Sequence, residues 1–259
     1  ALIDPQTSSP GITGPQTASK QLFLQPTAQN DAPSITGLDT SKAYTENSTI
    51  TIDSNVDLVD PELDLYPNWS GAVLTIERNG GANAEDQFGV TGSGDTGVNF
   101  SGGNIRIDTT EVGTFTNTGG TLVITFNTNA TAARVDQVIQ AITYKNLSDK
   151  PPASIQLNYS INDQNKHAGD ATQGTGQDQG AGGPLTGTAN ITLNITKTVD
   201  SPVLSAPGLN AQFTENGSAV TVDNTLTLTD ADDDNIHSAT VAITGNFLAG
   251  DTLAVNVGS

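Results

Sequence analysis

The stretch Ile155-Gln156-Leu157-Asn158-Tyr159-Ser160-Ile161 decides the fold class. Its apolar residues lie two positions apart, and a polar residue separates each pair. The same alternation recurs in Ala189, Ile191, Leu193 and Ile195. Because successive side chains of a β-strand point to opposite faces, each stretch has one apolar face and one wet face rich in Asn, Thr and Ser. The pattern predicts two long strands, each with one face in a core.

Shorter segments along the chain repeat this strand character. They are Ile50/Ile52, Val73-Leu74-Thr75-Ile76, Ile105/Ile107, Leu122-Val123-Ile124-Thr125-Phe126 and Ala141-Ile142-Thr143-Tyr144. Turn residues separate them, as in an all-β sandwich. One segment differs, because Val135, Val138, Ile139 and Ile142 follow a helical spacing behind Asn129 and Thr131 as possible N-caps. We predict an all-β sandwich with one short helix at about residues 131–141.

Five blocks of sequence occur twice, in the same order, 167 to 170 residues apart. The blocks of the first copy are Asn30-Asp31-Ala32-Pro33, Tyr44-Thr45-Glu46-Asn47-Ser48, Ile50-Thr51-Ile52-Asp53, Asp60-Pro61-Glu62-Leu63-Asp64 and Ala72-Val73-Leu74-Thr75-Ile76. Their counterparts in the second copy, in the same order, are Val199-Asp200-Ser201-Pro202, Phe213-Thr214-Glu215-Asn216-Gly217, Val220-Thr221-Val222-Asp223, Asp230-Ala231-Asp232-Asp233-Asp234 and Ala239-Thr240-Val241-Ala242-Ile243. Ordered repetition at one period indicates tandem homologous domains. We predict a linker or donor strand over 1–29, a complete sandwich over 30–198 and the N-terminal part of a second sandwich over 199–259.

The second copy is too short to bury a core of its own. Its inward candidates are Phe213, Val220, Val222, Leu226, Leu228, Val241, Ile243 and Leu253. We expect strands from another chain or a neighbouring segment to complete it, with Gln21-Leu22-Phe23-Leu24 as one donor candidate. The alternative is a cut in a longer protein, and the chain, which starts at Ala1 and lacks Met, has the character of a processed piece.

Composition narrows the function further. Nine Lys and Arg face 28 Asp and Glu among 259 residues, for a formal net charge of −19. Nine scattered cations cannot neutralise a phosphate backbone or bind an anionic membrane, so nucleic acid and membrane surfaces are excluded as partners. The chain has no Cys, only two His and no apolar run of about 20 residues, so we expect neither disulfides nor membrane insertion. Without a recognisable catalytic constellation, we expect no enzyme.

The repeated blocks concentrate carboxylates. Like charges this close repel one another unless a cation lies among them, and Ca²⁺ takes six to eight oxygens, largely from carboxylates and carbonyls. We therefore predict a calcium-binding protein, although the same acids also fit solvated turns. The predicted metal ligands are Glu46, Asp60, Glu62 and Asp64 in the first copy and Glu215, Asp230, Asp232 and Asp234 in the second, together with Asp31, Asp163 and Asp200.

The sequence resembles the cadherin-like tandem domains of giant bacterial repeat adhesins, which are secreted by the type I route and often carry RTX repeats. The blocks that carry the resemblance include Asn30-Asp31-Ala32-Pro33, Tyr44-Thr45-Glu46-Asn47, Ala141-Ile142-Thr143-Tyr144-Lys145-Asn146 and Tyr159-Ser160-Ile161-Asn162-Asp163. It covers residues 30–259. It implies a Greek-key β-sandwich with calcium between successive domains. It also implies that Glu46, the Asp60/Glu62/Asp64 turn and Asp163 are intradomain ligands, and that Asp31 and Asp200 are junction ligands.

The resulting hypothesis is a calcium-rigidified, extracellular module of a bacterial surface adhesin that acts in cell adhesion or biofilm. Its partners would be neighbouring homologous domains, other copies of the chain and an unknown cell-surface ligand. Two alternatives stay open. One is a structural surface filament that assembles by strand exchange. The other is a calcium-dependent glycan-binding module, for which Trp69 beside the acidic turn is the stacking candidate, although a place in the core suits Trp69 better.

Residues 163–187 contain seven Gly, and no large apolar residue precedes Leu185. This composition predicts a long, mobile loop between the two best-patterned strands. Its carboxylates Asp170 and Asp178 are further candidates that could compete with the metal ligands or contribute nothing. We expect His167 in this loop, and His237 after the acidic turn, to be solvated surface residues.

Overall fold

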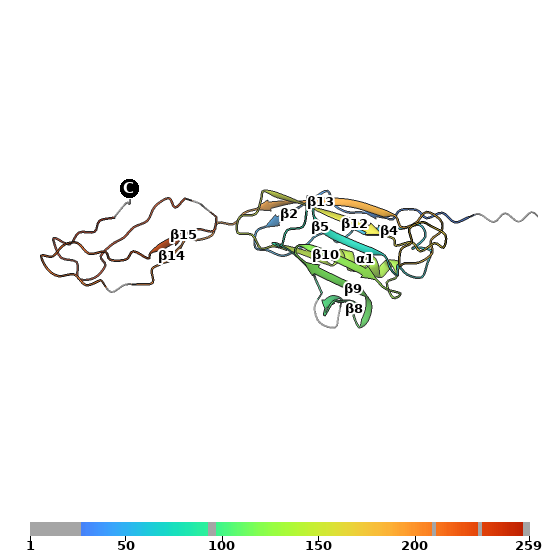
Figure 1. Cartoon of the computed structure of the whole chain (residues 1–259), viewed down its shortest axis with the longest axis horizontal. Coiled ribbons are helices and arrows are strands. Elements are labelled where there is room, and N and C mark those ends of the chain that lie inside the picture. Colours follow the sequence, from blue (N-terminus) through green and yellow to red (C-terminus); the bar gives the residue numbers. More distant parts are fainter. Residues whose placement is uncertain (1–26, 93–96, 209–210, 233–234, 256–259) are drawn as a thin grey trace, which may run out of the picture.

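The computed structural model describes residues 27–92, 97–208, 211–232 and 235–255. In these ranges the chain is almost entirely β-structure (Figure 1). The main sheet has eight strands, in the spatial order β2 (Ser41–Thr45), β13 (Thr186–Thr196), β12 (Ser154–Asn162), β5 (Val73–Arg78), β10 (Thr121–Phe126), β9 (Thr110–Thr118), β8 (Asn104–Ile107) and β7 (Val98–Ser101). Strand β2 runs parallel to β13, and the other neighbours are antiparallel.

Two smaller sheets complete this part of the chain. One contains β3 (Ile50–Thr51), β11 (Ile142–Asn146) and β6 (Asp86–Val90), and the other pairs β1 (Ser34–Thr36) with β4 (Asp57–Val59). The single helix of the described residues, α1 (Ala132–Gln140), packs beside β4, where the Asp136 carboxylate accepts a hydrogen bond from the Leu58 N–H at 3.1 Å. This helix is not long and apolar enough to cross a membrane. The all-β sandwich and the helix at about 131–141 are thus confirmed.

One hydrophobic core lies among these sheets. Leu157, Tyr159 and Ile161 of β12 are fully buried, as the alternation of the sequence requires. Tyr44 of β2 contacts Tyr144 of β11 edge to face, with ring centroids 5.4 Å apart. Such long-range packing joins the first strands of the domain to one of its last, so the core depends on almost the whole of residues 34–196.

A buried carboxylate links the main sheet to the three-stranded sheet. Asp86 of β6 accepts two hydrogen bonds from Arg78 of β5, at 2.8 and 2.6 Å. The same carboxylate accepts hydrogen bonds from the Tyr144 hydroxyl at 2.5 Å and from the Asn146 side-chain amide at 2.9 Å. Because buried charge is tolerated only when it is fully paired, this network fixes how the sheets face one another.

The second copy looks different. Its described part contains one two-stranded sheet, β14 (Val203–Ser205) with β15 (Thr227–Thr229). Its predicted inward residues Phe213, Val222 and Val241 are exposed, and the described residues of this copy form no core of their own. The proposed donor Gln21-Leu22-Phe23-Leu24 lies outside the described residues. Figure 1 shows this copy extending from the end of the sandwich at which β2 is labelled.

Candidate metal centre

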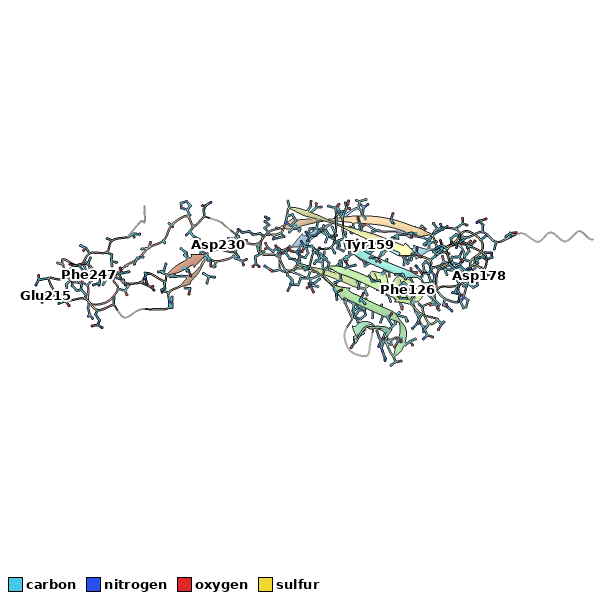
Figure 2. All side chains as sticks on the ribbon, viewed as in Figure 1. Phe126, Tyr159, Asp178, Glu215, Asp230 and Phe247 are labelled. Carbon is cyan, nitrogen blue, oxygen red and sulfur yellow. The ribbon has the colours of Figure 1, made fainter. Side chains whose placement is uncertain are left out.

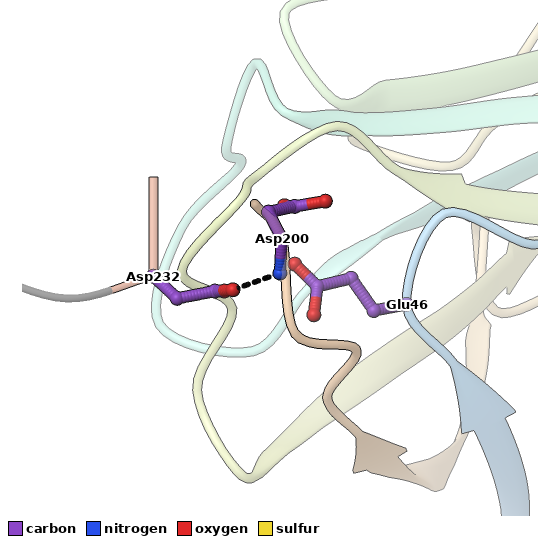
Figure 3. Close-up of side chains that lie close together, drawn as sticks. All are labelled: Glu46, Asp200 and Asp232. Atoms are coloured by element: carbon purple, nitrogen blue, oxygen red, sulfur yellow. Dashed lines mark hydrogen bonds between the residues drawn. The ribbon is translucent and has the colours of Figure 1, made fainter. Parts of the chain in front are cut away.

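Three carboxylates from distant parts of the sequence meet where the first copy joins the second. Glu46 directly follows β2, Asp200 lies in the linker after β13, and Asp232 belongs to the acidic turn that follows β15. One carboxylate oxygen of each lies within 4.8 Å of the others (Figure 3). We refer to Glu46, Asp200 and Asp232 as the junction cluster.

Backbone contacts hold the junction cluster in place. The Glu46 N–H donates to the carbonyl of Thr196 at 3.0 Å, and the Thr198 N–H donates to Glu46 Oε2 at 2.8 Å. The Asp200 N–H donates to Asp232 Oδ2. These bonds connect the end of β2, the linker and the second copy directly.

Glu46 has one oxygen that these contacts leave unused. Its residue is only 3% exposed, yet Glu46 Oε1 has no hydrogen-bond partner. Figure 3 shows the Glu46 carboxylate directed toward Asp200. A buried, unpaired carboxylate oxygen is costly, so an oxygen in this position is suited to bind a cation.

The electrostatics of the junction cluster favour a positive charge. Partial burial, followed by the carboxylates of Asp232, Asp149, Glu46 and Asp230, raises the pKa of Asp200. Asp149 and Asp230 line the same groove as Asp200, together with Ser201, Val203, Thr229 and Ala231. A divalent cation would remove this repulsion, because several carboxylates and nearby carbonyls provide the oxygen ligands that Ca²⁺ prefers.

The acidic turn of the first copy has the same local geometry as that of the second. Asp60 Oδ1 accepts from the Glu62 N–H at 3.0 Å, and Asp230 Oδ1 accepts from the Asp232 N–H at 2.9 Å. The Asp31 N–H donates to Glu62 Oε2 at 3.1 Å, as the Asp200 N–H donates to Asp232. In the residues described, the two turns therefore share these hydrogen bonds as well as their place in the repeat.

The turn at 60–64 lies at the opposite end of the sandwich from the junction cluster. It follows β4, whereas Glu46 follows β2, and Figure 1 shows these strands toward opposite ends. The resemblance implied that Glu46 and the 60–64 turn are both intradomain ligands, but the structure does not bring them together. The strand β2 carries Glu46 away from that turn, and the linker brings it to the second copy instead.

Several buried oxygens gather near the 60–64 turn. Asp60 Oδ2, Asn30 Oδ1 and Gln179 Oε1 are buried without hydrogen-bond partners. Asp163 connects two of these residues, because its Oδ2 accepts from the Asn30 side chain at 2.8 Å and its backbone carbonyl accepts from Gln179 Nε2 at 3.2 Å. Burial, opposed by N–H bonds from Leu63 and Glu62, raises the pKa of Asp60 to about 6, and the charges of Glu62 and Asp163 add to this rise. Asn30 and Gln179 were not expected from the sequence, since amides carry no charge signal.

The remaining predicted ligands have other surroundings. Both carboxylate oxygens of Asp64 accept hydrogen bonds, from the Asp60 N–H and from Trp69 Nε1, each at 3.1 Å. Glu215 is exposed, and Figure 2 shows it at the far end of the second copy from Asp230. Asp234 lies outside the described residues. The structure thus brings together Glu46, Asp200 and Asp232, and separately Asp60, Glu62 and Asp163 near Asp31.

The segment between β12 and β13, residues 163–185, is packed rather than loose. Lys166 N–H donates to Gln177 O at 2.9 Å, and Asn165 and Gln179 are buried. His167 forms an ion pair with Asp178 at 2.7 Å, which raises the pKa of His167 and lowers that of Asp178. The predicted loop is thus braced by hydrogen bonds, and buried polar side chains such as Asn165 do the packing that apolar residues usually do. His167 lies at the surface, as expected, with 30% of its side chain exposed and paired with Asp178. We call residues 163–185 the β12–β13 loop.

Trp69 is fully buried and donates its indole N–H to Asp64. The core position is confirmed, so Trp69 offers no exposed face to a sugar. The glycan-binding alternative therefore loses its stacking candidate.

Comparison with known proteins gives little further guidance. No family model matches the chain, and no curated protein matches it. One solved structure, the T6 backbone pilin of serotype M6 Streptococcus pyogenes, aligns with 11% sequence identity and a TM-score of 0.32 over 67% of this chain. The chain spans 37% of that pilin chain. A likeness at this level assigns neither a family nor a function to the chain.

Proposed function

We propose that this chain is an extracellular structural module whose two repeat copies are fixed relative to one another by Ca²⁺ at the junction cluster. The carrying observation is the unpaired, buried Oε1 of Glu46 beside Asp200 and Asp232. The role is mechanical, and we assign no reaction to it. An adhesin of a bacterial surface is the setting in which such a module would project a distal binding domain.

The linker explains why an ion would matter. Interfaces between tandem domains are small by default, so domains pivot about their linkers unless something else holds them. Here Glu46 comes from the first copy, Asp200 from the linker at the start of the second copy, and Asp232 from the acidic turn of the second copy. A single ion bound by all three would restrict the bending of residues 198–202.

A second ion near the 60–64 turn is part of the same proposal. Its ligands would come from Asp60, Glu62 and Asp163, with Asn30 and Gln179 as neutral oxygen donors. The support is the set of three unpaired buried oxygens at this end of the sandwich. At this end a preceding homologous domain, or another copy of the chain, would be the neighbour.

Two spin labels across the junction test the proposal. The chain has no Cys, so Asn194→Cys and Ser205→Cys, both exposed, can be labelled selectively. We expect a narrow distribution of label–label distances in millimolar Ca²⁺ and a broad one in EDTA. A calcium concentration 100 times the Kd would also stabilise the bound form by about 2.7 kcal/mol.

The matched variants are Asp232→Asn and Asp223→Asn. Both remove one charge from the second copy, but Asp223 lies outside the junction cluster, where it accepts hydrogen bonds from Thr225. With Asp232→Asn, Ca²⁺ should no longer narrow the distribution of label–label distances. With Asp223→Asn, Ca²⁺ should narrow this distribution as it does in the chain without either substitution. The proposed function would be refuted if the labelled chain that keeps Asp232 and Asp223 gave the same distribution of label–label distances in Ca²⁺ and in EDTA.

A further inference from the structure

The segments that begin the two repeat copies occupy equivalent places in the repeat, but their surroundings differ. Asn30 begins the first copy, and Val199 begins the second. Asn30 is 4% exposed, whereas Val199 is 92% exposed. The difference arises from the β12–β13 loop, which lies against the segment Ala28–Asn30.

The loop pairs with this segment through backbone hydrogen bonds. The Asn30 N–H donates to Ala181 O at 2.9 Å, and the Ala181 N–H donates to Ala28 O at 3.0 Å. This pattern is a parallel bridge between Gln29 and Ala181. Residues 28–30 are therefore held as an added strand would be, by main-chain groups that depend little on side-chain identity.

Side chains strengthen this pairing. Asn30 Nδ2 donates both to Gly183 O and to Asp163 Oδ2, each at 2.8 Å. The loop is itself braced, because Asp170 Oδ2 accepts from the N–H groups of Gly182 and Gly183 at 3.1 and 2.8 Å. All of these contacts are direct hydrogen bonds between protein groups.

Gly180 allows the close approach. Its φ is +111°, and a Cβ at this position would lie 2.6 Å from the backbone C and O of Ala28. Gly169, in the same loop, has a similar φ of +106° but has open space where its Cβ would lie. A side chain is strained at both positions, yet only at Gly180 would it also push the linker away.

We propose that the β12–β13 loop binds residues 28–30 and fixes the direction in which the chain joins the first sandwich, with or without calcium. Among the described residues, no loop lies in this way against residues 198–202, so the joint there would depend on the ion, a contrast whose second half rests on the proposed function. In EDTA the molecule would then bend at residues 198–202 and stay rigid at residues 27–31.

Distances between spin labels at Thr27→Cys and Thr188→Cys, both exposed positions, test this proposal in EDTA. We expect a narrow distribution for the otherwise unchanged chain and for Gly169→Ala, and a broad one for Gly180→Ala. Hydrogen exchange gives a second readout, in which the Asn30 amide should exchange about tenfold faster in Gly180→Ala than in Gly169→Ala, as expected for loss of one hydrogen bond. A thermal melt of each variant checks that the sandwich still unfolds cooperatively.

A broad distribution in EDTA without either glycine substitution would overturn the proposal. So would identical distributions and exchange rates for Gly180→Ala and Gly169→Ala. The test is independent of the junction cluster, because labels at 194 and 205 report on calcium there while labels at 27 and 188 report on the loop. Failure of one proposal therefore leaves the other standing.

Discussion

The two repeat copies share their sequence blocks and their acidic turn, but only one of them buries its apolar residues. Tyr44 is 1% exposed, and its counterpart Phe213 is 65% exposed. Ile52 and Leu74 are fully buried, whereas their counterparts Val222 and Val241 are exposed. Equal local sequence thus gives equal turns without giving equal packing.

The reason lies in residues that follow the shared blocks in the first copy. Tyr44 packs on Tyr144 of β11, and Ile52 N–H donates to Ile142 O of the same strand. Leu74 and Ile76 lie between β10 and β12. A turn needs only neighbours in sequence, but a sandwich core needs strands that are about a hundred residues away.

The largest expected difference between the copies is in stability. Tyr44→Ala should destabilise residues 30–198 by about 3–5 kcal/mol, because it removes a buried ring and leaves a cavity. It also removes the hydroxyl that accepts a hydrogen bond from the Asn146 N–H. Phe213→Ala should change the same unfolding transition by less than about 0.5 kcal/mol, as exposed substitutions do. Urea unfolding measures both, and equal losses would mean that Phe213 has a covered position in solution.

The next largest difference is in calcium affinity. Glu46→Gln removes the negative charge of the carboxylate whose Oε1 has no hydrogen-bond partner. We expect a Kd for Ca²⁺ at least about tenfold weaker, equivalent to about 1.4 kcal/mol. Glu215→Gln is the matched control, because Glu215 occupies the same place in the repeat and is exposed. Isothermal titration calorimetry measures the affinities. If Glu215→Gln weakened binding as much as Glu46→Gln, the role of Glu46 would be disproved.

The smallest expected difference is in pH dependence. Folding raises the pKa of Asp60 from 3.8 to about 6, so the folded state holds a proton that the unfolded state has already lost. In EDTA the contribution of Asp60 to stability should therefore fall as pH rises from about 4 to about 6. Asp60→Asn should flatten this slope in thermal melts, and Asp230→Asn, at the equivalent position, serves as the control. The predicted direction would be contradicted if the contribution of Asp60 to stability rose with pH over this interval.

Calcium should act in the opposite direction over the same pH interval. A metal ion binds the ionised carboxylate, so its stabilising effect near the 60–64 turn should grow as Asp60 loses its proton. The difference in Tm between Ca²⁺ and EDTA should thus increase from about pH 4.5 to about pH 7 and should increase less in Asp60→Asn.

The sequence determined the features that depend on short spacing. Alternation of apolar residues predicted β12 and β13, a helical spacing predicted α1, and repetition predicted the equivalence of the turns at 60–64 and 230–234 for the residues described. Most metal-ligand candidates were also visible as charge, including Glu46, Asp200 and Asp232. Apart from the repetition, which compares blocks 167 to 170 residues apart, each of these signals lies within a few residues along the chain.

Only the tertiary structure decided which of these groups meet. The parallel pairing of β2 with β13 carries Glu46 to the linker and the second copy, although the sequence grouped it with Asp60. The β12–β13 loop packs through Asn165, Gln179 and several Gly, residues that by composition predict mobility. The role of a neutral amide or a glycine depends on which groups pack against it. Those neighbours are set by the order of the strands, which the spacing of residues along the chain does not encode.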